Sequence, residues 1–341
     1  MKRVRHLALT LFTLASIIVI YAVHTATSTS NPVGLQVVRI DSANGAIALA
    51  LWYPTSATPL PTTLMAGQLL NVAKDAPVLG THLPLVVLSH GNNGSALSHV
   101  DLAMELASAG YVVAALTHTG DNFADQSKQA SPSLFRERAE QLRAVIDYVL
   151  GTWSNAQKVL PGRIGAYGFS AGGFTVLTLI GGAPNMETIG NHCKRSPEFI
   201  CEALEQLKSP LLHSATNAGP FQIDNRIRAA VVAAPGLGFT FANGGLSDVH
   251  VPVQVWNGDR DETVPYATNT KIVQEGLGPH AEWRQLHGAS HRSFLAPCGL
   301  LKPTALCSDP EGFDRRTAHV FMNAEIIHFF NVQLKKKRPT R

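Results

Sequence analysis

Gly168-Phe169-Ser170-Ala171-Gly172 is the segment that decides the fold of this 341-residue chain. It reads G-x-S-x-G, the tight turn that holds a nucleophilic serine between a strand and a helix. Residues 163–167 before it have a strand-like composition, and residues 173–180 after it can continue as a buried helix. An isolated match of this kind is more often a plain Gly/Ser loop. The strand before it and the helix after it favour the nucleophile interpretation, because small neighbours let chain and substrate approach closely.

Short apolar runs alternate with helical patterns along residues 31–334, which we interpret as one domain. We expect an opening hairpin of 35–40 and 47–52 around Asn44-Gly45, and further strands at 84–88, 111–116, 227–234, 251–256 and 282–286. Helices are expected at 98–109, 131–149, 268–277 and 315–334, a long surface loop at 54–83, and an irregular insertion at 183–226. This order predicts an α/β fold, a mostly parallel, doubly wound sheet with helices on both faces and an insertion after the nucleophile helix. Ligands of such sheets bind beyond the carboxyl ends of the strands.

The charge of the chain lies mainly at its two ends. The net charge is +4, but three basic residues at positions 2–5 and five at 335–341 supply eight positive charges, which leaves −4 for the body between them. A mildly acidic body carries no basic footprint for nucleic acid, so we expect no nucleic-acid partner. Residues 335–341 are interpreted as a solvated basic tail.

Residues 1–30 have the pattern of an export segment. Lys2, Arg3 and Arg5 precede an apolar run at 7–23, which is long for a signal peptide and short for a full membrane span. We therefore keep two interpretations, a cleaved signal peptide and a membrane attachment through residues 7–23. Both place the body outside the cytoplasm, in the periplasm, in the medium or at the membrane.

The four cysteines fall into two close pairs, Cys193 with Cys201 and Cys298 with Cys307. An even count in an exported chain predicts two local disulfides. The alternative, a tetrahedral zinc site, is disfavoured because the spacings of eight and nine residues do not resemble C-x2-C.

A serine nucleophile needs a base, and the base needs an acid that orients it, in the chain order serine, acid, histidine. Asp261 follows a late strand within a Gly-x-x-Asp-x-x-Val-Pro spacing that is typical of the acid loop in hydrolases of this kind, and Asp259 is the runner-up. His291 follows the next strand, beyond a small-residue turn, and is the expected base. We interpret His287 as structural, and His118 as either a pocket residue or a structural hydrogen-bonding residue.

Negative charge that develops on the substrate requires preorganised N–H donors. The N–H of Ala171, directly after the nucleophile, is one expected donor. The other is the N–H of Asn92 in Ser89-His90-Gly91-Asn92-Asn93-Gly94, which follows a buried strand and is close to the H-G-G-G type of oxyanion element. The plain alternative is a Gly/Asn turn.

With these motifs, the chain resembles the α/β-hydrolase superfamily. More narrowly, it looks like the exported bacterial proteins described as predicted dienelactone hydrolases, which are themselves similar to platelet-activating-factor acetylhydrolases. The similarity includes Leu51-Trp52-Tyr53-Pro54, Leu88-Ser89-His90-Gly91, the serine motif and residues 309–315. It implies a triad of Ser170, Asp261 and His291 with Asn92 and Ala171 as oxyanion donors. Dienelactone hydrolases carry a cysteine nucleophile, so the serine here argues against the dienelactone substrate.

We therefore expect a serine-dependent hydrolase of small-molecule carboxylic esters that works through an acyl-enzyme, with no metal and no organic cofactor. One alternative is a lipase or polyester hydrolase for long or insoluble acyl substrates, with residues 183–226 as a lid. The other is a catalytically inactive envelope binding protein on the same fold. A peptidase could use the same triad, but no feature of the sequence supports one.

Overall fold

The computed structural model describes residues 26–64, 69–129, 131–213, 220–299 and 304–335. The expected export segment up to residue 25 and most of the basic tail lie outside the described residues. A single sheet of ten strands runs through the described part, in the order β10-β9-β8-β7-β5-β6-β2-β1-β4-β3. The strands are β1 Val33–Ile40, β2 Ile47–Pro54, β3 Leu60–Thr63, β4 Leu69–Lys74, β5 Leu83–Ser89, β6 Val112–Thr117, β7 Val159–Phe169, β8 Ile227–Ala233, β9 Val253–Gly258 and β10 Ala281–Leu286.

Six neighbouring strands of the sheet pair in parallel, in the order β6-β5-β7-β8-β9-β10. The expected hairpin is confirmed, with β1 and β2 paired antiparallel from Val33↔Pro54 to Ile40↔Ile47. β2 also pairs antiparallel with β6 and so joins the hairpin to the parallel part. The expected α/β fold with a mostly parallel, doubly wound sheet is therefore confirmed.

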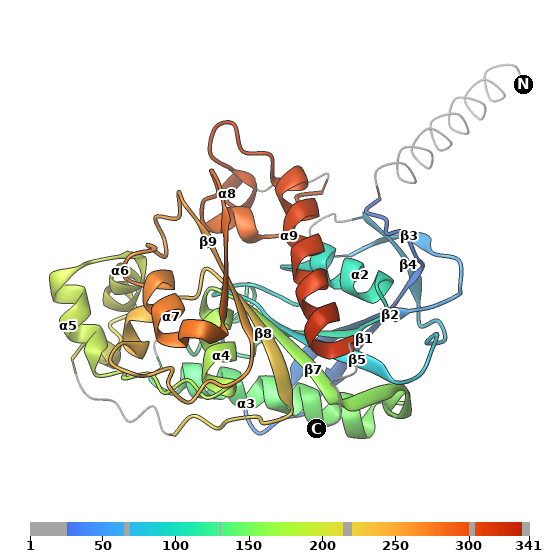
Figure 1. Ribbon diagram of the computed structural model, residues 1–341, viewed down its shortest axis with the longest axis horizontal. Coiled ribbons are helices and arrows are strands. Elements are labelled where there is room, and N and C mark those ends of the chain that lie inside the picture. The colour runs from blue at the N-terminus through green and yellow to red at the C-terminus, as the bar shows by residue number, and fades with distance from the viewer. Residues whose placement is uncertain (1–25, 65–68, 130, 214–219, 300–303, 336–341) are drawn as a thin grey trace, which may run out of the picture.

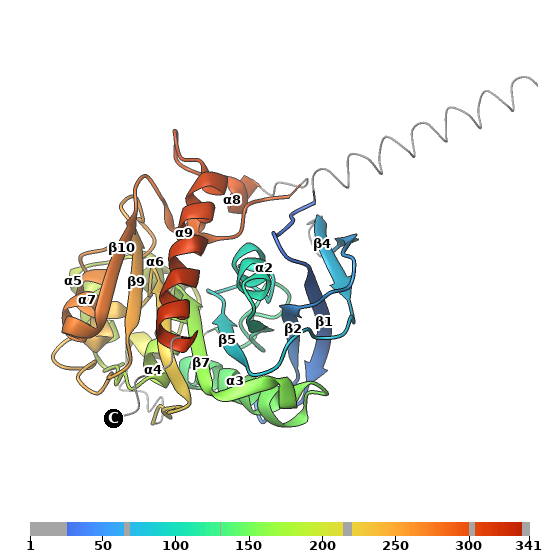
Figure 2. The same ribbon diagram turned by 45° about the vertical axis from the view of Figure 1, so that its right-hand side comes forward.

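Helices cover both faces of the sheet, as Figures 1 and 2 show. α2 and α9 pack together over one face, where the apolar side chains of β2, β6 and β7 form one core. α3 and α4 pack together over the opposite face with α7, and a second core lies beneath them. The helices are α2 Val100–Ser108, α3 Leu134–Asp147, α4 Ala171–Leu179, α5 Thr188–Arg195, α6 Phe199–Gln206, α7 Thr270–Leu277, α8 Thr304–Cys307 and α9 Arg315–Phe330.

Two expectations about the segments between these elements are wrong. The stretch 54–83 is not only a loop, since β3 and β4 lie within it and β4 pairs in parallel with β1. Its Pro and Thr content hid the buried Leu70 and Val72, which extend the core to this edge. The insertion at 183–226 is not irregular either, because it contains the two short helices α5 and α6.

No helix in the described ranges has both the length and the apolar character needed to cross a bilayer.

Candidate active site

Ser170 lies on the sharp turn between β7 and α4, with φ 55° and ψ −119°. This conformation is strained for a residue with a side chain, and it turns the serine out of the strand direction. The flanking glycines make the turn sterically possible. A Cβ on Gly168 would lie 2.1 Å from the carbonyl oxygen of Gly172, and a Cβ on Gly172 would lie 2.0 Å from that of Ser89. The G-x-S-x-G pattern is thus a requirement of the local backbone.

Backbone hydrogen bonds from the neighbouring strand region hold the turn in place. The Ser170 N–H donates to the carbonyl of Ala233 at the end of β8 (2.9 Å). The carbonyl of Ser170 accepts from the N–H of Gly236 (3.1 Å). Gly236, in the loop after β8, also lines the cavity, and the sequence analysis missed it. Gly236 could have been predicted from its position in the loop after a parallel strand, where the ligands of such sheets bind.

His291 comes from the loop after β10 and lies beside the serine. Its Nε2 is 3.0 Å from Ser170 Oγ, and its ring lies 4.7 Å from the ring of Phe169. His291 begins a short helical turn, residues His291–Phe294. The side chains of Ser290 and Ser293 close this turn, since each accepts from the backbone N–H of the other. Phe169 and this turn together fix where the imidazole points.

Asp261, after β9, meets the other side of that imidazole. Its Oδ2 lies 2.7 Å from His291 Nδ1, while its Oδ1 accepts from the N–H groups of Thr263 (3.0 Å) and Val264 (2.8 Å). The carboxylate is buried and the imidazole nearly so. The two backbone donors fix the carboxylate so that one oxygen remains for the histidine.

The alternative acid, Asp259, lies elsewhere. Its Oδ1 accepts from the N–H of Gly288 (2.6 Å), and its Oδ2 lies 3.2 Å from Nδ1 of His287. The His287 side chain is 83% exposed, so this pair lies at the surface. The structure therefore brings Ser170, His291 and Asp261 together and leaves Asp259 and His287 outside the cluster.

The two expected oxyanion donors come from different elements and reach the same cavity. Asn92 and Ala171 both line it, together with Ser170 and His291. Ala171 is the first residue of α4, so its N–H has no acceptor within the helix. His118 is fully buried and does not line the cavity; it bonds Ser89 and Gln141 instead. Of the two interpretations of His118, the structural one is confirmed.

The cavity has a volume of about 790 Å³. Its lining is rich in aromatic and aliphatic side chains from the loop after β6, the insertion and the segment before α9. Three of them, Phe123, Phe199 and Leu306, are large and about half exposed, at 53%, 51% and 49%. These three side chains were not predicted from the sequence, because exposed apolar residues in loops carry no periodic signal. They give the cavity an apolar mouth.

Both cysteine pairs lie at disulfide distance and border this region. Cys193 in α5 joins Cys201 in α6, with 5.3 Å between the Cα atoms, and Cys298 joins Cys307 with 6.0 Å. Cys298 and Cys307 line the cavity, as do Phe199 and Ile200 next to Cys201. The disulfides thus hold two wall segments that are otherwise short and loop-rich. Within the described ranges, no three His, Cys, Asp or Glu side chains form a group that could hold a metal ion.

Comparison with known proteins agrees with this geometry. Residues 61–148, which include the Asn92 loop, match the family model "platelet-activating factor acetylhydrolase, isoform II". Among solved structures, the chain is similar to a ferulic acid esterase from Streptomyces cinnamoneus. The TM-score is 0.64 at 19% identity, over 92% of this chain and 94% of the other. Among curated proteins, none matches the sequence. The structural likeness shows the fold, and the family match supports a carboxylic ester hydrolase.

Proposed function

We propose that the chain, which has the fold of the α/β-hydrolases, is a serine-dependent hydrolase of carboxylic esters acting outside the cytoplasm. The single observation that carries the proposal is the continuous chain of contacts from Ser170 Oγ through the His291 ring to Asp261, at 3.0 and 2.7 Å. These are the distances that a nucleophile, a base and an orienting acid require.

In the first half-reaction, Ser170 Oγ bonds to the ester carbonyl carbon while its proton passes to Nε2 of His291. The carbonyl oxygen becomes negative and accepts from the N–H groups of Asn92 and Ala171. When the tetrahedral intermediate collapses, the bond to the alcohol oxygen breaks and His291 returns the proton to the leaving alcohol. Asp261 stays ionised and stabilises the imidazolium.

In the second half-reaction, water takes the place of the alcohol. His291 Nε2 removes a proton from water as its oxygen bonds to the acyl carbon. The collapse releases the carboxylic acid and returns the proton to Ser170 Oγ. Asp261 Oδ2 accepts from the Nδ1–H of His291 in both half-reactions. The carboxylate stays in place because its Oδ1 is held by the backbone N–H groups of Thr263 and Val264.

The location outside the cytoplasm rests on two features. Disulfides persist in oxidising compartments, and the two cysteine pairs are joined here. The apolar run at 7–23 behind a basic start is the second feature, read from the sequence alone.

A second candidate is a hydrolase for bulky or long acyl groups, including lipid and polyester substrates. The observation that favours it is the apolar mouth formed by Phe123, Phe199 and Leu306 over a cavity of about 790 Å³. The ferulic acid esterase with the same fold is named for an aromatic acyl group, and the four phenylalanines that line this cavity would suit one. A series of p-nitrophenyl esters from acetate to palmitate separates the two candidates: a maximum at four carbons or fewer supports the small-ester enzyme.

The deciding experiment is Ser170→Ala. We expect kcat on p-nitrophenyl butyrate to fall by at least about 10⁴-fold, and labelling by a fluorophosphonate probe to disappear. Exposed Ser154→Ala is the matched control and should keep full activity. Turnover that survives in Ser170→Ala contradicts the mechanism. A folded wild-type protein that the probe does not label supports the inactive binding protein instead.

A further inference from the structure

Arg138 in α3 and Asp121 in the loop after β6 form an ion pair that is fully buried beneath the active site. Their side chains have no exposed surface, and Arg138 Nη1 lies 2.5 Å from Asp121 Oδ2. Removing two charges from water is costly, and the cost is recovered only if the remaining donors and acceptors also find partners. Those remaining partners are the backbone segments that carry Asn92 and Ala171.

The guanidinium of Arg138 contacts both of these segments. Its Nη2 donates to the carbonyl oxygen of His90, two residues before Asn92. Its Nε donates to Thr175 Oγ1 (3.3 Å), and that hydroxyl donates to the carbonyl of Ala171 (2.9 Å). One rigid, planar group therefore fixes the distance between the loop after β5 and the first turn of α4.

Asp121 holds the other side of the same loop. Its Oδ1 accepts from the N–H of Asn93 (3.3 Å) and from Nε2 of Gln129 (3.0 Å). The loop is thus tied to the ion pair both before and after Asn92: the carbonyl of His90 bonds Arg138, and the N–H of Asn93 bonds Asp121.

From these contacts we propose that Arg138 and Asp121 are positioning residues for the oxyanion hole. Together they orient the backbone N–H groups of Asn92 and Ala171 so that both point at the position of the substrate oxyanion. The proposal rests on the proposed esterase function. Oxyanion donors act only if they are already in place when the charge develops, 2.7–3.1 Å from the oxyanion in general. A loop of Gly, Asn and Asn has little stiffness of its own, so its geometry must be imposed from beneath.

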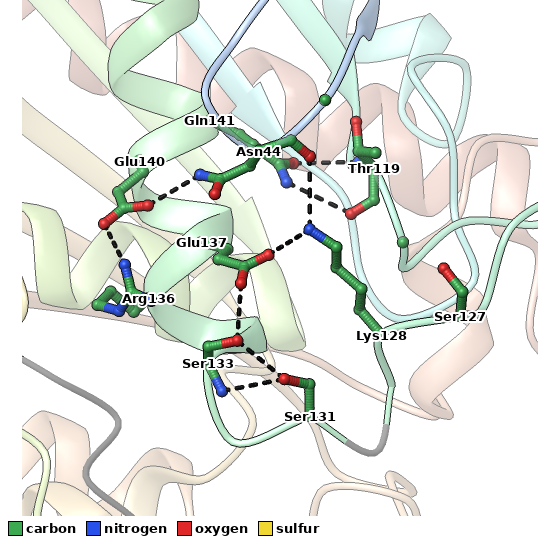
Figure 3. Close-up of polar contacts among 12 residues, drawn as sticks. Asn44, Thr119, Ser127, Lys128, Ser131, Ser133, Arg136, Glu137, Glu140 and Gln141 are labelled. Atoms are coloured by element: carbon green, nitrogen blue, oxygen red, sulfur yellow. Dashed lines mark hydrogen bonds and ion pairs between the residues drawn. The ribbon is translucent and has the colours of Figure 1, made fainter.

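The helix that carries Arg138 is itself anchored by the polar side chains around it (Figure 3). Glu137 accepts from Lys128 Nζ (2.6 Å), and Glu140 accepts from Nδ2 of Asn44 in the β1–β2 turn (2.8 Å). Gln141 bonds both backbone groups of Thr119, just before Asp121. These contacts fix α3 against the loop that supplies Asp121, so the ion pair has a stable base from which to act.

The test is the double variant Arg138→Met/Asp121→Leu, which removes both charges and leaves neither partner buried alone. We expect kcat for p-nitrophenyl butyrate to fall about 10- to 100-fold while KM changes less than about threefold. This estimate is below the loss of roughly 100- to 1000-fold per deleted donor, because the donors remain but are misplaced. The Ki of an alkyl trifluoromethyl ketone, whose serine adduct carries the oxyanion, should rise by the same factor as the fall in kcat.

The matched control is Arg226→Met/Asp224→Leu. This ion pair, at 2.6 Å, lies at the start of β8, at the opposite end of that strand from the active site. The control should lower the melting temperature without changing kcat. Arg138→Lys keeps the charge but loses the fork, so it should recover only part of the activity.

Three outcomes are informative. A folded double variant with kcat and Ki within twofold of wild type overturns the proposal and leaves the ion pair a purely structural element. If the double variant does not fold, Thr175→Val decides, because it removes only the hydroxyl between Arg138 and Ala171; a three- to tenfold fall in kcat supports the proposal and no change overturns it. Failure of the esterase function itself is seen separately, as turnover that survives Ser170→Ala in the otherwise wild-type chain.

Discussion

The backbone N–H of His118 donates a 2.9 Å hydrogen bond to Nε2 of His90, so His90 carries no proton at that nitrogen. Its Nδ1–H donates to the carbonyl of Gly91 (2.6 Å). His118 is held in the same way: Gln141 Oε1 accepts from the Thr119 N–H and from His118 Nδ1, which leaves Nε2 to accept from the hydroxyl of Ser89. Both buried rings are therefore neutral next to the Arg138–Asp121 pair.

This arrangement predicts that the protein loses stability in acid. Burial, with the Arg138 charge adding to it, lowers the pKa of His90 to about 3 and that of His118 well below 6.5, and burial lowers the pKa of His99 to about 4. Below pH 6.5 the unfolded chain binds three protons that the native state does not. The free energy of unfolding should then fall by up to about 4 kcal/mol per pH unit between pH 6 and 5. Urea denaturation at pH 5, 6 and 7 measures it.

His99→Phe is the informative variant for this prediction, since His99 packs against Tyr167 and Phe169 and a phenyl ring can take its place. The variant removes one of the three proton-binding sites of the unfolded chain. The free energy of unfolding should therefore depend less steeply on pH, by about 1.4 kcal/mol per pH unit. Equal stability of wild type at pH 7 and pH 5 would contradict the assignment of neutral buried rings.

His319 titrates in the opposite sense. Burial would lower its pKa, but Asp101 at 2.6 Å raises it above 6.5, and the Ser293 carbonyl accepts from its Nε2 at 2.8 Å. Burial likewise works against the Asp101 charge, yet His319 lowers the pKa of that carboxyl to about 2.

The stabilisation from His319 is complete below pH 6.5 and is lost as the pH rises through its raised pKa. The stabilisation from Asp101 is lost only as the pH falls toward 2. The stability difference between wild type and His319→Gln should therefore be constant from pH 4.5 to 6.5 and shrink at higher pH, as urea denaturation of both proteins would show. A difference that grows above pH 6.5 would refute the ion pair.

Asp261 and Asp259 give a paired test of the triad acid. Asp261→Asn should lower kcat by about 10³- to 10⁴-fold, because an amide disfavours the productive tautomer of His291. Asp259→Asn changes only surface contacts with Gln285, His287 and Gly288, and we expect kcat within threefold of wild type. Steady-state kinetics on one ester suffices. The reverse pattern would transfer the acid role to Asp259.

Gly172→Ala should disrupt the active site, because the new Cβ would lie 2.0 Å from the carbonyl oxygen of Ser89. Neither backbone can move without shifting Ser170 or the Asn92 loop. We expect a loss of about 2 kcal/mol or more in the free energy of unfolding and at least a 100-fold loss of kcat. Gly151→Ala is the control, since nothing lies within 4 Å of its Cβ position and its stability should change by about 0.5 kcal/mol or less. Normal activity in Gly172→Ala would show that the turn tolerates a side chain.

Removal of the Cys193–Cys201 disulfide, by replacing both residues with serine, should loosen α5 against α6. Closing a loop of this length contributes about 2–3 kcal/mol in the chain-entropy model. Because Phe199 and Ile200 beside Cys201 line the cavity, we also expect KM for a long acyl ester to rise more than KM for the acetate. Unfolding monitored by circular dichroism and a two-substrate kinetic comparison give both readouts. An unchanged melting temperature with unchanged KM values would show that α6 is held by other contacts, such as those of Glu198 with Thr268 and Asn269.

Much of the fold could be predicted because buried parallel strands are short apolar runs; β5 and β6 have this form, and so does β8 after Arg228. Strands β3 and β4 escaped prediction, since β3 is a short, mostly exposed edge strand of Leu, Pro and Thr, and β4 buries only three of its six residues within a stretch rich in Pro and Thr. The helices α5 and α6 also escaped prediction: each buries only one or two side chains, Ile189 in α5 and Cys201 and Leu204 in α6, so neither has a clear apolar face.

The sequence by itself predicted the serine turn, the two disulfide pairs and the chain order of the proposed triad, because each depends on neighbours within about ten positions or on a fixed chain order. Only the tertiary structure showed that His291 lies against Asp261 and not against Asp259, since both carboxylates follow β9 in the sequence. Only the tertiary structure likewise showed that Arg138, an ordinary residue of a helical pattern, lies beneath Asn92 and Ala171. Contacts between residues far apart in the chain are fixed by how the sheet and helices pack, and local sequence carries no signal for them.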